Sequence, residues 1–241
     1  MRTLFLPLLL SLALTANAED TPAGAAEFKQ GQSLYDAGKQ AEGLAKLEAA
    51  AEAGNASAMA MLGWLYMNTT EGLPERDAER GIAYYRQAAE AGNAEAANNL
   101  AIHYTHAIGV PLDKTLGLQW FLRAAALGHA PAMTTVGLFY ETGTVVPADP
   151  AQAQDWYHKA AKAGDAQGMY NLGMFLARGV AGPADVERGR KWLQAAADKG
   201  EPAAKEALDK LAAGEPLVPA AAPAEAAGEP APEAGADADS E

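Results

Sequence analysis

The sequence predicts an all-α fold made of repeated pairs of antiparallel helices, and three observations support this prediction. Alanine, the strongest helix former, accounts for 59 of the 241 residues. The runs of β-branched residues that all-β and doubly wound α/β domains need are missing. The sequence also repeats itself at a period of 36 residues. We therefore expect a solenoid of closely packed helices rather than a thick sandwich core.

The first 18 residues have the pattern of a cleavable signal peptide. Arg2 precedes an apolar run from Leu4 to Leu14, and Ala16-Asn17-Ala18 matches an A-x-A cleavage site. The run is too short to span a membrane, and the sequence has no cysteine for a bacterial lipid anchor. We expect cleavage after Ala18, a periplasmic or secreted protein, and a short linker at 19–26.

The second helix of each repeat is marked by three features at constant spacing. An aspartate opens it as the N-cap, an aromatic residue follows seven positions later, and the pattern A-A-x-x-G closes it at a C′ glycine. The aspartates are Asp77, Asp113, Asp149 and Asp185. The aromatic residues are Tyr84, Trp120, Trp156 and Trp192.

The first helix of each repeat begins just after a closing glycine and carries a Leu-Gly type pair. Four full repeats are predicted, at about 55–92, 93–128, 129–164 and 165–200. A degenerate helical pair precedes them at 27–53, and a capping helix follows at Pro202–Leu211, so the solenoid covers 27–211. The remaining segment, 212–241, holds 12 alanines, 5 prolines and 7 acidic residues without a basic one, which predicts disorder.

These motifs resemble the Sel1-like repeat, a relative of the tetratricopeptide repeat. The pattern is A-x-A-x-x-x-L-G-x-x-Y, a glycine-containing loop, and D-x-x-x-A-x-x-W-Y-x-x-A-A-x-x-G, and the copy at 130–164 matches it best. The fourth copy has Leu176 in place of the tyrosine, which we interpret as an end effect. The resemblance implies a right-handed superhelix whose first helices line a concave groove.

Helical spacing assigns one face of the first helices to this groove. Equivalent positions then form a stripe of large apolar residues, flanked by columns of amides and hydroxyls that suit an extended peptide or a partner's helix. Trp64 is out of phase with the other tryptophans, so it is either a binding anchor or packs against the degenerate pair. The candidate binding residues are Trp64, Asn98, Asn99, Ile102, Leu138, Tyr170, Asn171 and Met174.

The sequence gives no catalytic, cofactor or metal site. It contains no nucleophile elbow, zinc-protease motif or phosphate-binding loop. His103 and His106 are three residues apart on one helix but have no acidic residue within that turn, and His129 occupies a turn position. Cysteine-rich exported members of the family are linked to β-lactam binding, but this chain lacks their cysteine pairs.

The predicted function is therefore an exported scaffold or adaptor that binds a protein or peptide in the bacterial envelope. The net charge of −13 argues against nucleic acid or an anionic membrane as partner, although much of that charge lies in the tail. Two alternatives stay open: a periplasmic binder or enzyme acting on a cell-wall glycan or muropeptide, and a homo-oligomer.

Overall fold

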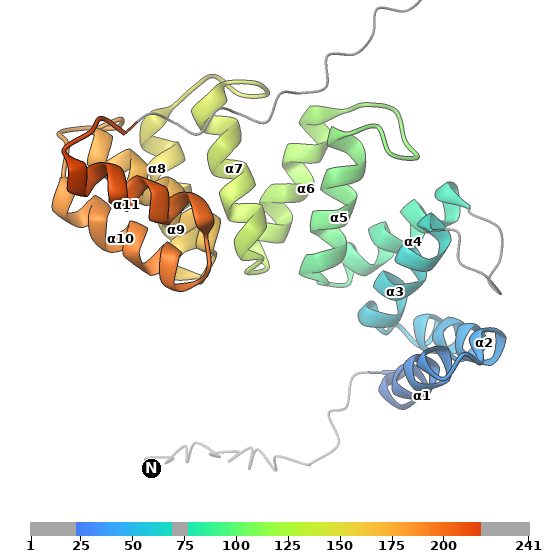
Figure 1. Cartoon of the computed structure of the whole chain (residues 1–241). Helices are drawn as coiled ribbons and strands as arrows, with labels where there is room; N and C mark the ends of the chain where they lie inside the picture. Colours follow the sequence, from blue (N-terminus) through green and yellow to red (C-terminus); the bar gives the residue numbers. More distant parts are fainter. Residues whose placement is uncertain (1–22, 69–76, 218–241) are drawn as a thin grey trace, which may run out of the picture. The chain divides into compact units, whose positions relative to one another are not determined.

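The computed structural model describes residues 23–68 and 77–217 (Figure 1). These residues form eleven helices and no strand, which confirms the all-α prediction. The predicted signal peptide and most of the predicted tail lie outside the described residues. The helices are α1 Ala25–Asp36, α2 Gln40–Glu52, α3 Ala56–Met67, α4 Ala78–Glu90, α5 Ala94–Thr105, α6 Lys114–Ala126, α7 Ala130–Thr142, α8 Pro150–Lys162, α9 Ala166–Arg178, α10 Val186–Asp198 and α11 Pro202–Ala213.

The chain divides into two compact units. The N-terminal unit contains residues up to His103 together with Ala107–Pro111, and therefore α1 to α4 and most of α5. The C-terminal unit contains Tyr104–His106 and the chain from Leu112 onward, and therefore α6 to α11.

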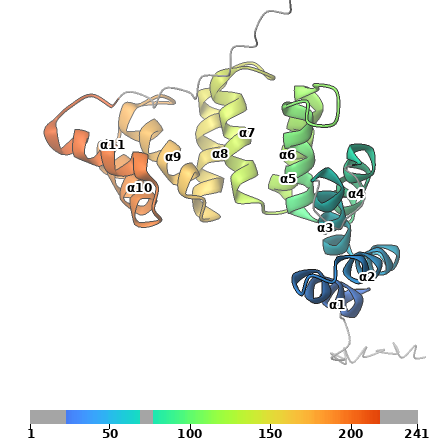
Figure 2. The same cartoon turned by 45° about the vertical axis from the view of Figure 1, so that its right-hand side comes forward.

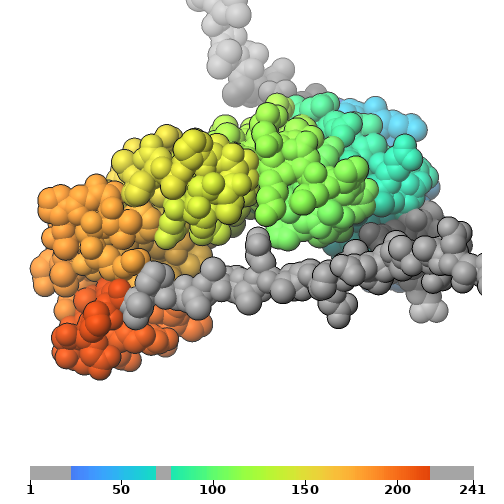
Figure 3. All heavy atoms as spheres, turned by 90° about the horizontal axis from the view of Figure 1, so that it is seen from above, coloured from blue at the N-terminus to red at the C-terminus, as the bar shows by residue number. Residues whose placement is uncertain are grey.

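Within each unit, consecutive helices pack as antiparallel pairs. The most extensive contacts join α1 to α2 and α3 to α4 in the N-terminal unit, and α7 to α8 and α9 to α10 in the C-terminal unit (Figure 2). Each pair then packs on the next one along the chain, as α2 does on α3 and α8 on α9. Helix α11 repeats the position of a first helix and packs on α10 and α9 (Figure 3).

From α3 onward a side chain caps the start of each helix, whereas α1 and α2 have no side-chain cap. Asp77, Asp113, Asp149 and Asp185 accept hydrogen bonds from backbone N–H groups in the first turns of α4, α6, α8 and α10. His129 acts in the same way at α7, where its Nδ1 accepts from the N–H of Ala132 at 3.2 Å. The turn position predicted for His129 is therefore a helix cap.

Small residues allow the two helices of a repeat to approach closely. A Cβ atom added at Gly137 of α7 would lie 2.6 Å from the Cε1 atom of Tyr157 on α8. The same contact occurs in the first repeat, where a Cβ at Gly63 would lie 2.7 Å from Tyr85. The second repeat has Ala101 and Phe121 at these positions. Much of the alanine and glycine content thus reflects helix crossings that leave no room for a larger side chain.

Candidate functional site

Two large apolar side chains stand out because they are exposed within a helix rather than at its first residue, at a cap or in a loop. Trp64 on α3 is 48% exposed and Leu138 on α7 is 49% exposed. The other exposed large apolar residues of the described chain lie in loops or at helix ends: Ile108, Leu112, Leu127, Val180 and Val186. Trp64 and Leu138 also occupy the same position of the repeat, so the exposure recurs at one register rather than at scattered sites.

In the N-terminal unit, Trp64 lies in the last turn of α3. The side chain of Asn68 donates to the carbonyl oxygen of Trp64 at 2.7 Å, and the backbone N–H of Asn68 donates to the same oxygen at 3.1 Å, so Asn68 caps the helix end. The predicted neighbours in the stripe are less exposed, since Asn98, Asn99 and Ile102 on α5 are all half-buried. Trp64 is therefore the main open anchor of this unit.

Asn99 and Asn171 have a structural partner that the sequence did not reveal. The amide of Asn99 donates to the hydroxyl of Tyr85, and the amide of Asn171 donates to the hydroxyl of Tyr157. Both pairs join the second helix of one repeat to the first helix of the next, across the same register. Where Phe121 replaces the tyrosine, Thr135 replaces the asparagine. These asparagines therefore stabilise the contact between repeats, in addition to their predicted role in ligand binding.

In the C-terminal unit this pair belongs to a longer chain of hydrogen bonds. Gln167 donates to the Oδ1 atom of Asn171 at 2.9 Å, and the hydroxyl of Tyr157 donates to Glu141 at 2.5 Å. Burial and the nearby carboxylate of Glu141 raise the pKa of Tyr157, so the hydroxyl stays protonated and able to donate. Glu141 lies three residues from Leu138 on α7, so this polar network borders the exposed leucine.

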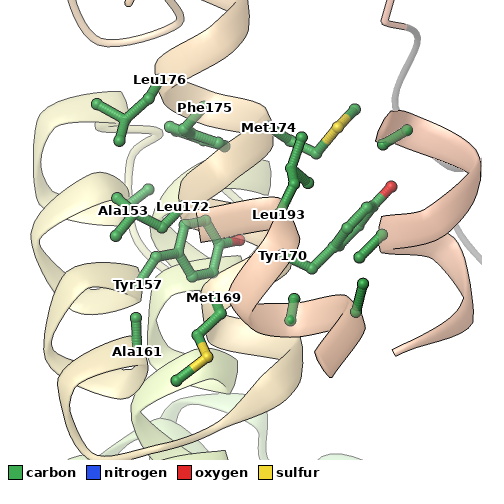
Figure 4. Close-up of a cluster of buried hydrophobic side chains, with 14 residues drawn as sticks. Ala153, Tyr157, Ala161, Met169, Tyr170, Leu172, Met174, Phe175, Leu176 and Leu193 are labelled. Atoms are coloured by element: carbon green, nitrogen blue, oxygen red, sulfur yellow. The ribbon is translucent and has the colours of Figure 1, made fainter. Parts of the chain in front are cut away.

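Tyr170 and Met174 correct the prediction, because the structure places them in the core instead of on an open face. They are 7% and 5% exposed and belong to a cluster that includes Leu193 of α10 and Ala204 and Ala207 of α11. In Figure 4 both side chains point away from Tyr157 toward the C-terminal helices. Helix α11 covers Met174 on α9, whereas Leu138, at the equivalent position on α7, stays open. The apolar stripe therefore ends at Leu138.

The described residues hold no group of three or more side chains that could bind a metal ion. The ring of His103 packs on Tyr85 with the ring centroids 5.6 Å apart, and its Nδ1 lies 2.7 Å from the carbonyl oxygen of Ile108. The equivalent positions of the next repeats hold Phe139 and Phe175, which pack on Phe121 and Tyr157 in the same way. His103 therefore takes the place of an aromatic ring that packs on the second helix of the preceding pair.

A hollow that the sequence did not predict lies beside the fourth repeat. It has a volume of about 700 Å³ and is lined by the end of α9, the loop that follows it, the start of α10 and Gln154 of α8. Its charged lining residues are Asp185, Glu187 and Arg188. The one signal for it in the sequence was Leu176, which replaces the tyrosine found at this position in the other three repeats.

Fold and site together define a helical-repeat scaffold: stacked helix pairs with exposed apolar anchors at a fixed position. The Sel1 repeat model matches residues 56–93, 94–129, 130–165 and 166–201, which is more than half of the chain. The chain belongs to the Sel1 repeat family, and its fold is the all-α repeat solenoid of that family. Proteins of this family are typically scaffolds for protein–protein interaction.

Solved structures of similar proteins agree with this assignment. A Sel1 repeat protein from Oxalobacter formigenes is 29% identical with a TM-score of 0.68, over 81% of this chain and 79% of that one. The protective antigen c5321 of uropathogenic Escherichia coli strains is 26% identical with a TM-score of 0.71. That match covers 79% of this chain but 41% of the antigen, so the chain spans about two fifths of its length.

No curated protein matches the sequence significantly. A search of the described helices for a segment long and apolar enough to cross a membrane found none.

Proposed function

We propose that the chain is an exported scaffold that binds a protein or peptide partner through the exposed face of its first helices. The observation that carries the proposal is the repeated exposure of a large apolar side chain at one register, Trp64 in α3 and Leu138 in α7. Neither residue is needed to fill the core of its unit, since each leaves about half of its surface in solvent. Large exposed apolar side chains of this kind are typical anchors of binding interfaces.

The surroundings of Leu138 favour a peptide or a helix as the ligand of the C-terminal unit. Its neighbours on α7 and α9 are polar, and several use only part of their hydrogen-bonding capacity within the protein. The hydroxyl of Thr142 donates to the carbonyl oxygen of Leu138 at 2.9 Å, and that of Thr135 donates to Pro131 at 3.1 Å. Each hydroxyl oxygen can still accept a hydrogen bond from a ligand. An apolar anchor bordered by such groups suits an amide backbone with one apolar side chain.

Export is part of the proposal and rests on the signal-like segment ending at Ala18. The mature chain would begin at Glu19, and its partner would belong to the bacterial envelope. Determination of the N-terminal sequence of the protein recovered from the periplasm tests this point directly. A chain recovered with Met1 intact would contradict it.

Binding can be tested with tagged protein used to capture partners from an envelope extract of the native host. We expect a protein that is captured by the unchanged chain and lost from Trp64→Ser or Leu138→Ser. Leu127→Ser is the matched control, because Leu127 is 42% exposed but lies at the C-terminal end of α6, outside the repeated register. It should retain the partner.

The opposite results would refute the proposal. Equal capture by all three variants would show that the repeated register does not bind the partner. Saturable binding of a muropeptide, with no protein partner that depends on Trp64 or Leu138, would favour a cell-wall ligand instead. A mass by light scattering of twice the chain, lost in the same variants, would indicate self-association through this face.

A further inference from the structure

The chain that follows α11 turns back onto the core cluster of the C-terminal unit. Gly214 ends the helix in the left-handed conformation, with a φ of 71°. The backbone N–H of Glu215 then donates to the carbonyl oxygen of Lys210 at 2.8 Å, which closes the turn. Leu217 packs against the cluster that contains Met174. The last residue that the structure describes is therefore held on this cluster.

The nearest open apolar position on the first helices is Leu138. It occupies on α7 the position that Met174 occupies on α9, and it is 49% exposed where Met174 is 5% exposed. Helix α11 runs parallel to α9, so its C-terminal end lies beside the C-terminal half of α9, where Met174 is. Helices α7 and α9 are in contact, so the equivalent positions on them lie roughly 8–10 Å apart.

The seven residues that follow Leu217 are apolar and uncharged. They read Val-Pro-Ala-Ala-Ala-Pro-Ala at 218–224, and the first charged residue after them is Glu225. The remainder, 225–241, holds six acidic residues and no basic one. The composition thus changes abruptly, and an apolar segment directly follows the point where Leu217 is held.

The length and stiffness of the 218–224 segment match the distance to α7. An extended chain advances about 3.3–3.6 Å per residue, so about three residues cross from α9 to α7 and the others can lie on α7. Pro219 and Pro223 favour an extended polyproline II backbone. Such a backbone loses less conformational entropy when it docks than a flexible one does.

The surface around Leu138 fits an uncharged extended segment. Thr135 donates its hydroxyl to the carbonyl oxygen of Pro131 at 3.1 Å, and its oxygen can still accept from a backbone N–H. The alanines of 218–224 supply such N–H groups, and the prolines and Val218 supply apolar surface. Glu141, three residues from Leu138, would repel the acidic residues of 225–241, so only the uncharged segment suits this face.

We propose that residues 218–224 of the chain itself cover Leu138 on α7. The segment extends to α7 the cover that α11 gives to Met174. This contact forms within one chain, so it does not depend on the existence of a partner. It bears on the proposed function in one respect, because a partner that binds at Leu138 has to displace the segment.

The absence of cysteine from the sequence allows a direct test by thiol modification. Thr142→Cys places a single thiol one turn from Leu138 on the same face of α7, and the uncharged reagent N-ethylmaleimide reports its accessibility. We expect this thiol to react about fivefold more slowly in the full mature chain than in a chain that ends at Leu217. That ratio corresponds to about 1 kcal/mol, the scale expected for covering the exposed half of one leucine.

A second truncation separates the apolar segment from the acidic one. A chain that ends at Ala224 keeps the apolar segment and loses the acidic residues, whose charge alone could slow the thiol. It should be protected as well as the full chain. Leu127→Cys supplies the control thiol, because Leu127 follows the last residue of α6 and lies outside the repeated register. Its rate should be the same in all three lengths, which contain every described helix and should show equal helicity by circular dichroism.

Matched substitutions in the full chain test the contact itself. Ala221→Asp places a charge inside the apolar segment and should raise the rate to that of the chain ending at Leu217. Ala227→Asp places the same charge beyond the segment and should leave the protection intact. Leu138→Ser should remove the protection of the thiol at position 142, since it removes the apolar surface that the segment covers.

Four outcomes would overturn the proposal. Equal rates in the full and shortened chains would show that nothing covers this face, and protection lost in the chain ending at Ala224 would assign it to the acidic residues. Protection that survives Leu138→Ser would place the contact elsewhere. Protection that rises with protein concentration would assign it to the tail of a second copy. Capture of a partner is a separate measurement, so its failure would leave these rates as they are.

Discussion

Substitution of Gly137 by alanine tests the register of the repeats most directly. The new Cβ atom would lie 2.6 and 2.7 Å from the Cε1 and Cδ1 atoms of Tyr157, whereas carbon atoms pack favourably at about 3.5–4.0 Å. The ring would have to move by about 1 Å to restore that spacing. It has little freedom to move, because Tyr157 is fully buried and its hydroxyl is held by both Glu141 and Asn171.

The expected cost follows from three terms of different sign. Overpacking of a filled core costs about 1–3 kcal/mol, and weakening a hydrogen bond to a charged carboxylate adds up to about 1.5–3 kcal/mol. Alanine returns about 1 kcal/mol through its higher helix propensity than glycine. We therefore expect Gly137→Ala to lower the free energy of unfolding by about 2 kcal/mol, which corresponds to a melting temperature lower by about 4–8 °C for a domain of this size.

A double-mutant cycle measured by urea denaturation identifies the cause. Phenylalanine at position 157 would have no hydroxyl to anchor the ring. The second repeat already has this combination, since Ala101 and Phe121 take the positions of Gly137 and Tyr157. Gly137→Ala should therefore cost about 1 kcal/mol less in the Tyr157→Phe background than in the native one. A stabilised or unchanged Gly137→Ala single variant would refute the packing argument, and a cycle with no coupling would refute the role of the hydroxyl.

Three further predictions concern other parts of the chain. Burial raises the pKa of Tyr85 to about 12 from the ordinary value of 10.0, so its contribution to stability is intact below pH 10 and falls as the pH rises through 12. Tyr85→Phe should flatten the alkaline decline in melting temperature, and an unchanged decline would contradict this. Asp165 accepts from the Thr134 hydroxyl at 2.6 Å and the backbone of α9, so Asp165→Ala should cost about 2 kcal/mol in urea unfolding and Asp165→Asn clearly less. Met174→Asp should destabilise by more than about 3 kcal/mol while Leu138→Asp, at the same repeat position, changes stability by about 0.5 kcal/mol or less in the same assay. Similar losses at both positions would contradict the covering of Met174 by α11.

The periodic part of the fold could be predicted because its determinants are local in sequence. An aspartate that caps a helix, as Asp149 does, bonds to residues only two and three positions away. The close contact at Gly137 also repeats at a constant spacing, so one register argument predicts it in several places. The exposed position of Trp64 followed from helical spacing in the same way.

The side-chain partners between repeats could not be predicted in this way. Helical spacing shows which face of α5 or α9 carries an asparagine, but not which side chain of another helix reaches it. The amides of Asn99 and Asn171 were therefore expected to face a ligand, although each donates to a tyrosine of the preceding helix. The burial of Met174 was missed for a related reason, because a column of equivalent positions ignores the terminal helix that covers its last member.

Comparison of the copies with one another separates structural positions from candidate binding positions. The tyrosine and asparagine at 157 and 171 are replaced together by phenylalanine and threonine at 121 and 135, and the Thr135 hydroxyl donates within its own helix to Pro131. Such correlated change indicates packing. At Leu176 the tyrosine is lost together with the carboxylate that accepts from it in the first repeat, since His158 takes the position of Glu48. The ring of His158 packs edge-on to Trp192, with the ring centroids 6.2 Å apart. This copy has therefore also exchanged its partners together, and the change at Leu176 marks a different packing between α8 and α10.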